Sequence, residues 1–182
     1  MSITIISRTK EHFETSRLMV ESCQSQLESE ADELSFAKAA MNLLTPKVTE
    51  TLPEDWQWVR DSREALRWLQ RRCKESRVFS IRLREQADLI GMLFLHHQQN
   101  ESSQRDWHIG YFIGESYWSK GYASEVIEAL VIWAKKEHKV RSLLGAVSNT
   151  NIGSIKVLEK NGFARTKHQG ASEQMIFFER VL

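Results

Sequence analysis

The spacing of apolar residues predicts helices in four parts of the chain. In one of them Val126, Ile127 and Leu130 recur at the three- and four-residue intervals that place side chains on one helix face. Three other segments show comparable helical patterns. We therefore expect helices over residues 28–44, 63–75, 122–137 and 151–163.

Strands are predicted where apolar and polar residues alternate or form short runs bounded by turn residues. The middle of segment 142–148 is apolar throughout, which is typical of a strand covered on both faces of its sheet. The polar residues 86–88 indicate a hairpin turn. We expect strands over residues 17–22, 78–85, 89–98, 106–114, 142–148, 163–169 and 173–182. This order of elements predicts an α+β fold with a mixed sheet.

Length and composition favour a single globular domain over residues 1–182, with 41% hydrophobic and 27% charged residues. The net charge of +1 gives no strong attraction to nucleic acid or to a membrane, so we expect neither partner. Apolar runs are too short for a signal peptide or a membrane span, which predicts a cytoplasmic protein. Cys23 and Cys73 lack metal or redox spacing, and the neighbours His96 and His97 point to opposite faces of a strand, so no metal is assigned.

The segment "SYWSKGYAS" (116–124) places a glycine between a strand and a long apolar helix. The first main-chain N–H groups of such a helix have no partners within it, and together with the helix dipole they form an anion site. Gly121 and the small Ala123 allow a phosphate to approach the backbone, and Ser119 and Ser124 offer hydroxyl donors. The alternative is an ordinary helix start with Ser119 near the N-cap.

A second segment, "NTNIGSIKVLEKNGF" (149–163), follows one strand-helix unit later. Together the two segments resemble the GNAT acetyltransferase superfamily, whose signature is Gln/Arg-x-x-Gly-x-Gly/Ala followed by Asn-x-x-Ala/Ser and a closing Gly-Phe. Gly121 and Ala123 match this signature, whereas Trp118 stands where many members have Gln or Arg. The loop sequence is similar to that of the RimJ/RimL-type ribosomal-protein N-terminal acetyltransferases, as is "ETSRLMV" (14–20).

The resemblance implies a mostly antiparallel, twisted sheet flanked by helices, in which the strands at 106–114 and 142–148 splay apart. Acetyl-coenzyme A would be the co-substrate, with its pantetheine arm between these strands and its pyrophosphate on the loop. Asn151 would lie near the pantetheine arm. The residues that this resemblance assigns to the cofactor are Tyr111, Phe112, Ile113, Ser119, Lys120, Gly121, Tyr122, Ala123, Ser124, Asn151 and Ser154.

The resemblance also suggests catalytic residues. Many members have a tyrosine acid seven residues after the motif asparagine, but here that position is Leu158, which has no proton to give. Ser154 is the remaining hydroxyl one turn after the asparagine, and we expect it to assist the departing thiolate. His108, whose usual pKa is near 6.5, and Glu173 are the candidates for the general base.

These features predict an acetyl-coenzyme A-dependent N-acetyltransferase that works by direct attack of an amine on the thioester. The expected acceptor is a protein or peptide N-terminus, such as the Ser or Ala of a ribosomal protein. One alternative is a small amine, for example a polyamine, an amino acid or an antibiotic. Another is a coenzyme A-binding sensor without turnover. The sequence is silent on oligomeric state and leaves a homodimer open.

Overall fold

The computed structural model describes residues 11–26, 30–53, 56, 59–99, 105–136, 140–166 and 174–182. Within these residues the strands form one eight-stranded sheet in the order β1-β2-β3-β4-β5-β6-β8-β7. Neighbouring strands are antiparallel except for the parallel pair β5 and β6. The strands are β1 (His12–Glu14), β2 (Leu18–Ser22), β3 (Arg77–Leu83), β4 (Leu89–Gln99), β5 (Arg105–Ile113), β6 (Val140–Ser148), β7 (Ala164–Thr166) and β8 (Met175–Val181).

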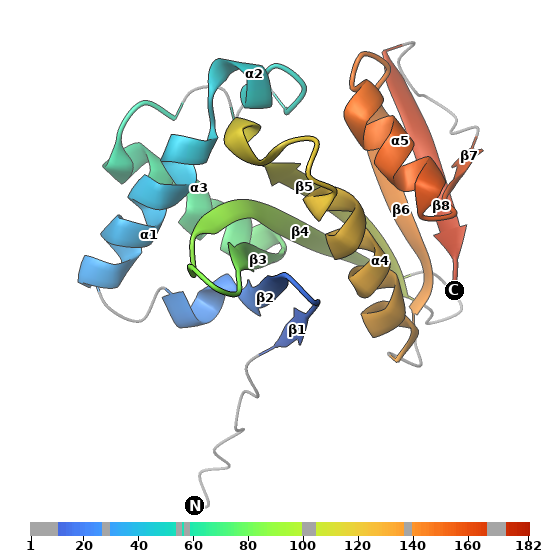
Figure 1. Ribbon diagram of the computed structural model, residues 1–182, viewed down its shortest axis with the longest axis horizontal. Helices are drawn as coiled ribbons and strands as arrows, with labels where there is room; N and C mark the ends of the chain where they lie inside the picture. Colours follow the sequence, from blue (N-terminus) through green and yellow to red (C-terminus); the bar gives the residue numbers. More distant parts are fainter. Residues whose placement is uncertain are drawn as a thin grey trace, which may run out of the picture.

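Helices cover both faces of the sheet (Figure 1). On one face α1 (Glu30–Leu43) packs against α3 (Ser62–Glu75) and β4, and α3 packs against β3. On the other face α4 (Tyr122–Lys135) packs against α5 (Ile152–Lys160) and against strands on both sides of the sheet centre. The shorter helices of the described residues include η1 (Cys23–Gln26), α2 (Pro46–Thr49) and η3 (Glu115–Tyr117). None of the described helices is long and apolar enough to cross a membrane.

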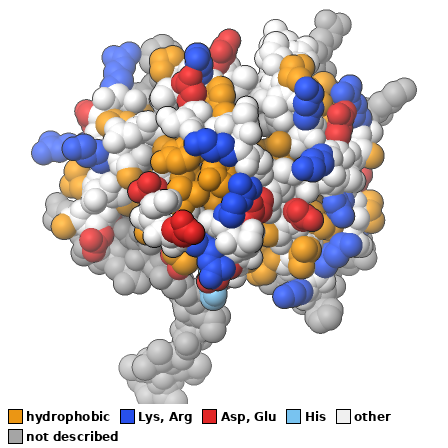
Figure 2. All heavy atoms as spheres, in the orientation of Figure 1, with side chains coloured by type: hydrophobic (Ala, Val, Ile, Leu, Met, Phe, Trp, Pro, Cys, Tyr) orange, Lys and Arg blue, Asp and Glu red, His pale blue; other side chains and the backbone are white. Residues whose placement is uncertain are grey.

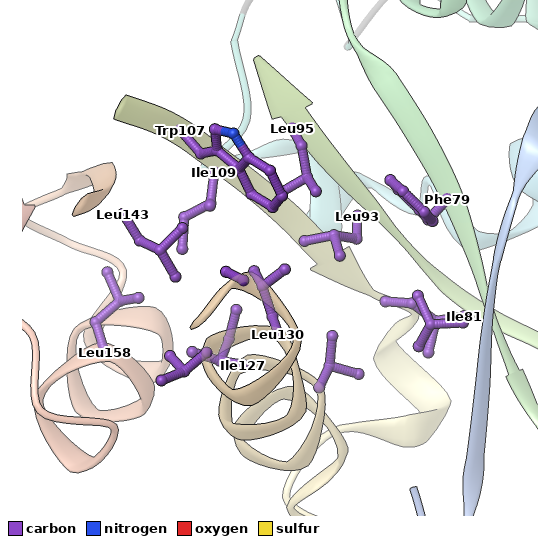
Figure 3. Close-up of a cluster of buried hydrophobic side chains, with 14 of the residues drawn as sticks. Phe79, Ile81, Leu93, Leu95, Trp107, Ile109, Ile127, Leu130, Leu143 and Leu158 are labelled. Atoms are coloured by element: carbon purple, nitrogen blue, oxygen red, sulfur yellow. The ribbon is translucent and has the colours of Figure 1, made fainter. Parts of the chain in front are cut away.

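The alternation of side chains along the central strands supplies two hydrophobic cores. Trp107 and Ile109 on β5 belong to the core beneath α4, whereas Phe112 belongs to the core beneath α1 and α3. Figure 3 shows Ile127 and Leu130 of α4 pointing toward the strand residues of the first core. The apolar residues whose spacing predicted α4 therefore form the face that packs this helix against the sheet.

The sheet opens between β5 and β6. Their parallel pairing runs from Arg105↔Val140 to Ile109↔Gly145 and ends there, while β5 continues along β4 and β6 continues along β8. Figure 1 shows the two strands diverging toward the side of the molecule where α2 lies. The predicted α+β fold and the splay between these strands are confirmed.

A buried carboxylate holds the closed end of this opening. Asp106 on β5 accepts two hydrogen bonds from the Arg141 guanidinium on β6, at 2.8 and 2.6 Å, and one from the Ser142 hydroxyl at 2.9 Å. The Arg141 hydrogen bonds are the main reason that the pKa of Asp106 is lowered. The two strands are therefore pinned together at one end while they separate at the other.

Several predicted boundaries needed correction. β1 and α2 were not predicted, because elements of three and four residues are too short for a periodic pattern to show. The helices predicted over 122–137 and 151–163 are shorter, at 122–135 and 152–160. The strand predicted over 163–169 is described only as β7, since residues 167–173 lie outside the described part of the chain. Gly162 follows α5 with a φ of +75°, as expected of a residue just past a helix end.

Candidate active site

A cavity of about 640 Å³ occupies the open end of the splay. Its walls come from four separate parts of the chain: α2 with the loop after it, the end of β5, the loop before α4, and the start of α5. Ten of the residues that the resemblance assigned to the cofactor line it, namely Tyr111, Phe112, Ile113, Ser119, Gly121, Tyr122, Ala123, Ser124, Asn151 and Ser154. The fold thus gathers the two sequence motifs, about 30 residues apart, around one space.

The loop before α4 has the geometry of an anion site. Gly121 is the N-cap residue of α4 with φ +82°, and no side chain caps the helix there. The N–H groups of the first helical turn, at residues 122–124, therefore remain available to a ligand. Ser119 also adopts a left-handed conformation, with φ +61°, and is not the helix cap. Ser119 thus lies two residues before the N-cap, and the alternative of an ordinary helix start with Ser119 near the N-cap stays open.

Two polar residues of this loop are already engaged within the protein. The Lys120 ammonium donates to the Ser116 carbonyl at 3.0 Å and lies 5.5 Å from the Tyr117 ring centroid, and Lys120 does not line the cavity. The Ser124 hydroxyl accepts a hydrogen bond from Asn161 Nδ2 at 3.1 Å. These contacts fix the loop from outside, so its main-chain N–H groups are its principal donors toward the cavity.

The end of β5 presents main-chain groups to the opening. Gly114 N donates to Ile90 O, so the alternation of antiparallel hydrogen bonding directs the main-chain groups of Ile113 away from β4. The Trp118 indole N–H donates to Ile113 O at 2.6 Å. Trp118, which departs from the family signature, therefore occupies one of the acceptors that the sequence reading left for pantetheine.

Asn151 caps α5 and connects it to the opposite wall of the cavity. Its Oδ1 accepts from Ser154 N at 3.0 Å, and its Nδ2 donates to Thr51 Oγ1 at 3.0 Å. The sequence reading placed Asn151 but missed Thr51, which follows α2 and carries no motif. Only the tertiary arrangement brings these residues together.

Tyr111 and Ser154 are neighbours in the cavity wall. The Tyr111 hydroxyl exposes less than 1 Å² and no described residue completes a hydrogen bond of good geometry with it. Burial raises the pKa of Tyr111 to about 12, and the nearby Ser154 hydroxyl opposes this rise in part. Tyr111 therefore stays protonated at neutral pH, and both Tyr111 and Ser154 line the cavity.

Of the two candidates for the general base, only His108 lies within the described residues. His108 lies on the paired part of β5, opposite Leu144, with its ring centroid 6.4 Å from that of His96. It does not line the cavity. Glu173 lies outside the described residues. Leu158 is buried in the core beneath α4, where its side chain would touch any Cβ added at Gly145.

Charges of both signs are mixed on one face of the molecule. Figure 2 shows basic and acidic side chains interspersed on the face seen in Figure 1, around a group of apolar side chains near its centre. This distribution agrees with the net charge of +1.

Comparisons with known proteins agree with this geometry. The profile of the family described as "Acetyltransferase (GNAT) domain" matches residues 25–164. The chain is 30% identical to the uncharacterized N-acetyltransferase YnaD of Bacillus subtilis (strain 168) over 87 residues. This aligned segment covers 48% of this chain and 49% of YnaD. The chain thus spans about half the length of this curated relative.

Two solved structures share the fold. RimL, a ribosomal L7/L12 alpha-N-protein acetyltransferase in complex with coenzyme A, aligns with a TM-score of 0.75 at 16% identity, over 94% of this chain and 98% of that one. An acetyl transferase from Salmonella typhimurium, which modifies the N-terminal serine of a 50S ribosomal subunit protein, aligns with a TM-score of 0.71 at 15% identity, over 94% and 99%. Taken with the family match, the splayed sheet and the glycine loop lead to one conclusion: the chain belongs to the GNAT acetyltransferase family.

Proposed function

We propose that the protein transfers the acetyl group of acetyl-coenzyme A to the N-terminal α-amine of a protein or peptide. The family match and the splayed sheet support the acetyl-coenzyme A half of this proposal. The structural neighbours named above include acetyltransferases whose substrates are ribosomal proteins. The acceptor half rests on the lining of the cavity.

The chain offers separate groups for each part of the cofactor. The uncapped N–H groups at the start of α4 bind the pyrophosphate, because they carry the positive end of the helix dipole. Main-chain groups at the end of β5 that point into the opening bind the pantetheine arm like an added strand. With the cofactor bound in this way, its thioester would lie in the cavity beside Ser154, which is one of the lining residues.

The observation that carries the choice of acceptor is the shortage of bases around the cavity. Among the described residues that line it there is no histidine, and the single carboxylate is Glu50. Deprotonating a lysine ε-amine at pH 7 costs roughly 4–5 kcal/mol, whereas an α-amine costs only about 1 kcal/mol. An α-amine needs little help from a base, so water is sufficient to take its proton.

The same lining disfavours a polyamine. Several positive charges on one acceptor require several carboxylates close by, because an unpaired cation is costly to desolvate. The described lining offers one carboxylate, Glu50, and its one ammonium, that of Lys47, is paired with Glu115 at 2.6 Å. The described part of the cavity therefore suits an acceptor with a single amine.

Ser154 supplies the assistance to the leaving group. As the amine nitrogen bonds to the thioester carbon and the C–S bond breaks, the electron pair stays on sulfur. We assign the Ser154 hydroxyl as the hydrogen-bond donor to that sulfur. The nitrogen loses its proton to water and the sulfur gains one from solvent, so the reaction balances without a covalent enzyme intermediate.

Steady-state kinetics with paired peptides test the acceptor. Two peptides of the same sequence are compared, one with a free N-terminus and no lysine, the other with a blocked N-terminus and one internal lysine. We expect kcat/KM to be at least 100-fold higher for the first, following the difference in deprotonation cost. Equal rates, or transfer only to small amines in the same buffer, would contradict the proposal. Coenzyme A binding without transfer to any amine would favour the sensor.

A further inference from the structure

Residues of the turn between β1 and β2 form hydrogen bonds and an ion pair with the first turn of α4. Glu125 of α4 accepts hydrogen bonds from Arg17 Nε at 2.7 Å and from Thr15 Oγ1 at 2.5 Å, and Arg17 Nη2 lies 2.5 Å from the same carboxylate. The Arg17 main-chain N–H also donates to it at 3.2 Å. More than a hundred residues separate these partners, so the contact joins two parts of the fold.

The same guanidinium supports the glycine loop. Arg17 Nη1 donates to the Lys120 carbonyl at 3.1 Å, and Arg17 Cζ lies 4.5 Å from the centroid of the Tyr122 ring. A Cβ built on Gly121 would lie 3.6 Å from Arg17 Nη2. Arg17 therefore stands directly behind the loop that offers its N–H groups to an anion, while not lining the cavity itself.

Arg17 compensates the negative charge of Glu125. Burial alone would raise the pKa of Glu125, but the hydrogen bonds from Thr15 and Arg17 more than offset it and hold the pKa below its usual value. Glu125 is therefore ionised at neutral pH and lies in the same first turn of α4 as the N–H groups that would receive phosphate. An uncompensated negative charge so close to a bound phosphate would repel it.

We propose that Arg17 is a positioning residue for the pyrophosphate of coenzyme A, which acts by cancelling the charge of Glu125 beside the 119–124 loop. The inference rests on the coenzyme A half of the proposed function and is independent of the acceptor. It assigns Arg17 no contact with the reacting atoms. It also gives a reason why the β1–β2 turn reaches across to α4.

A double-mutant cycle read by isothermal titration calorimetry tests this proposal, with coenzyme A as the probe. Arg17→Ala exposes the Glu125 charge and is expected to raise the Kd roughly tenfold or more. Glu125→Gln removes the repelling charge and is expected to leave the Kd unchanged or lower it. The double variant Arg17→Ala/Glu125→Gln should regain most of the affinity that Arg17→Ala loses.

A purely structural clamp predicts the opposite pattern. In that case Glu125→Gln weakens binding as Arg17→Ala does, and the double variant is as weak as either, which would overturn the proposal. An unchanged Kd in Arg17→Ala would overturn it as well. If Arg17→Ala does not fold, Arg17→Lys takes its place in the test. This variant keeps the positive charge but not the planar guanidinium, and we expect it to retain most of the affinity for coenzyme A.

A second ligand distinguishes the phosphates. Dephospho-coenzyme A keeps the pyrophosphate and lacks the 3′-phosphate, so Arg17→Ala should lose the same factor with both ligands. A loss seen only with coenzyme A would place the effect at the 3′-phosphate and overturn the assignment. Calorimetry needs no acceptor. If the wild-type protein fails to bind coenzyme A, the proposed function is overturned as well. If the wild-type protein binds but the variants do not follow the expected pattern, only the role of Arg17 is overturned.

Discussion

Asn151 and Thr51 lie 100 residues apart in the sequence and are joined by a hydrogen bond of 3.0 Å across the mouth of the cavity. Asn151 also caps α5, so one amide side chain contacts both this helix and the segment that follows α2. The two walls of the cavity are therefore mechanically connected. This connection makes Thr51, for which the sequence predicted no role, part of the cavity wall.

Replacing Thr51 with valine removes the hydrogen bond and keeps the shape of the side chain. We expect the free energy of unfolding to fall by about 0.5–1.5 kcal/mol, since one ordinary hydrogen bond is lost. Asn151→Ala should cost about 1 kcal/mol more, because the N-cap of α5 is lost as well. Urea unfolding of both single variants and the double variant measures the coupling. Fully additive effects would show that the two side chains do not interact.

Gly121 and Gly162 form a matched pair, because both adopt left-handed conformations, with φ of +82° and +75°. An alanine at either position should destabilise the fold by about 1–2 kcal/mol, since a Cβ is disfavoured at positive φ. Only Gly121→Ala should raise the Kd for coenzyme A, by roughly tenfold, because only the loop at Gly121 is proposed to bind the pyrophosphate. Calorimetry and thermal unfolding check the two effects separately. Equal loss of affinity in Gly162→Ala would refute the assignment of the loop.

Ser154→Ala should lower kcat and spare cofactor binding. The hydroxyl donates to charge that develops on sulfur only as the C–S bond breaks, so its loss should reduce kcat roughly 10- to 100-fold. The Kd for coenzyme A should change less than threefold by our estimate, since the pyrophosphate contacts remain. Pre-steady-state and binding measurements on the same variant separate the two. A large rise in Kd with unchanged kcat would make Ser154 a binding residue instead.

Asp106 makes stability depend on pH. Its pKa in the folded protein is lowered, chiefly by hydrogen bonds from Arg141, so its contribution is fully present above the unfolded value of about 3.9 and is lost as pH falls through the lower folded value. Asp106→Asn should therefore cost about 1–2 kcal/mol at pH 7, a range that allows for the half-exposed Arg141. The difference from wild type should shrink below pH of about 4. Unfolding curves at pH 7 and pH 3.5 measure it, and a constant difference would contradict this account.

Periodicity in the sequence was sufficient for the large elements. The apolar face of 122–137 and the apolar run of 142–148 became α4 and β6, because burial against a sheet requires those patterns. The splay between β5 and β6 was expected from the family resemblance and not from any pattern, and the residue at which their parallel pairing stops, Gly145, was not predicted. Short elements such as β1 and α2 carry too few residues for a period to emerge.

The candidate site was predicted only in part, for a related physical reason. Motif residues such as Gly121 and Asn151 could be placed because their backbone roles are local: a left-handed N-cap and a helix cap. Thr51, Arg17 and Glu125 act through partners about a hundred residues away. No local signal marks such residues, so they emerge only once the chain is folded.

The proposal is tested most directly by competition within a single molecule. A peptide that carries both a free α-amine and an internal lysine is incubated with acetyl-coenzyme A and the protein, and tandem mass spectrometry locates the acetyl group. The proposed function predicts acetylation at the N-terminus, with the lysine unmodified while free α-amine remains. Acetylation of the lysine first, or at both amines at equal rates, would contradict the central claim that the cavity selects an amine that is easily deprotonated.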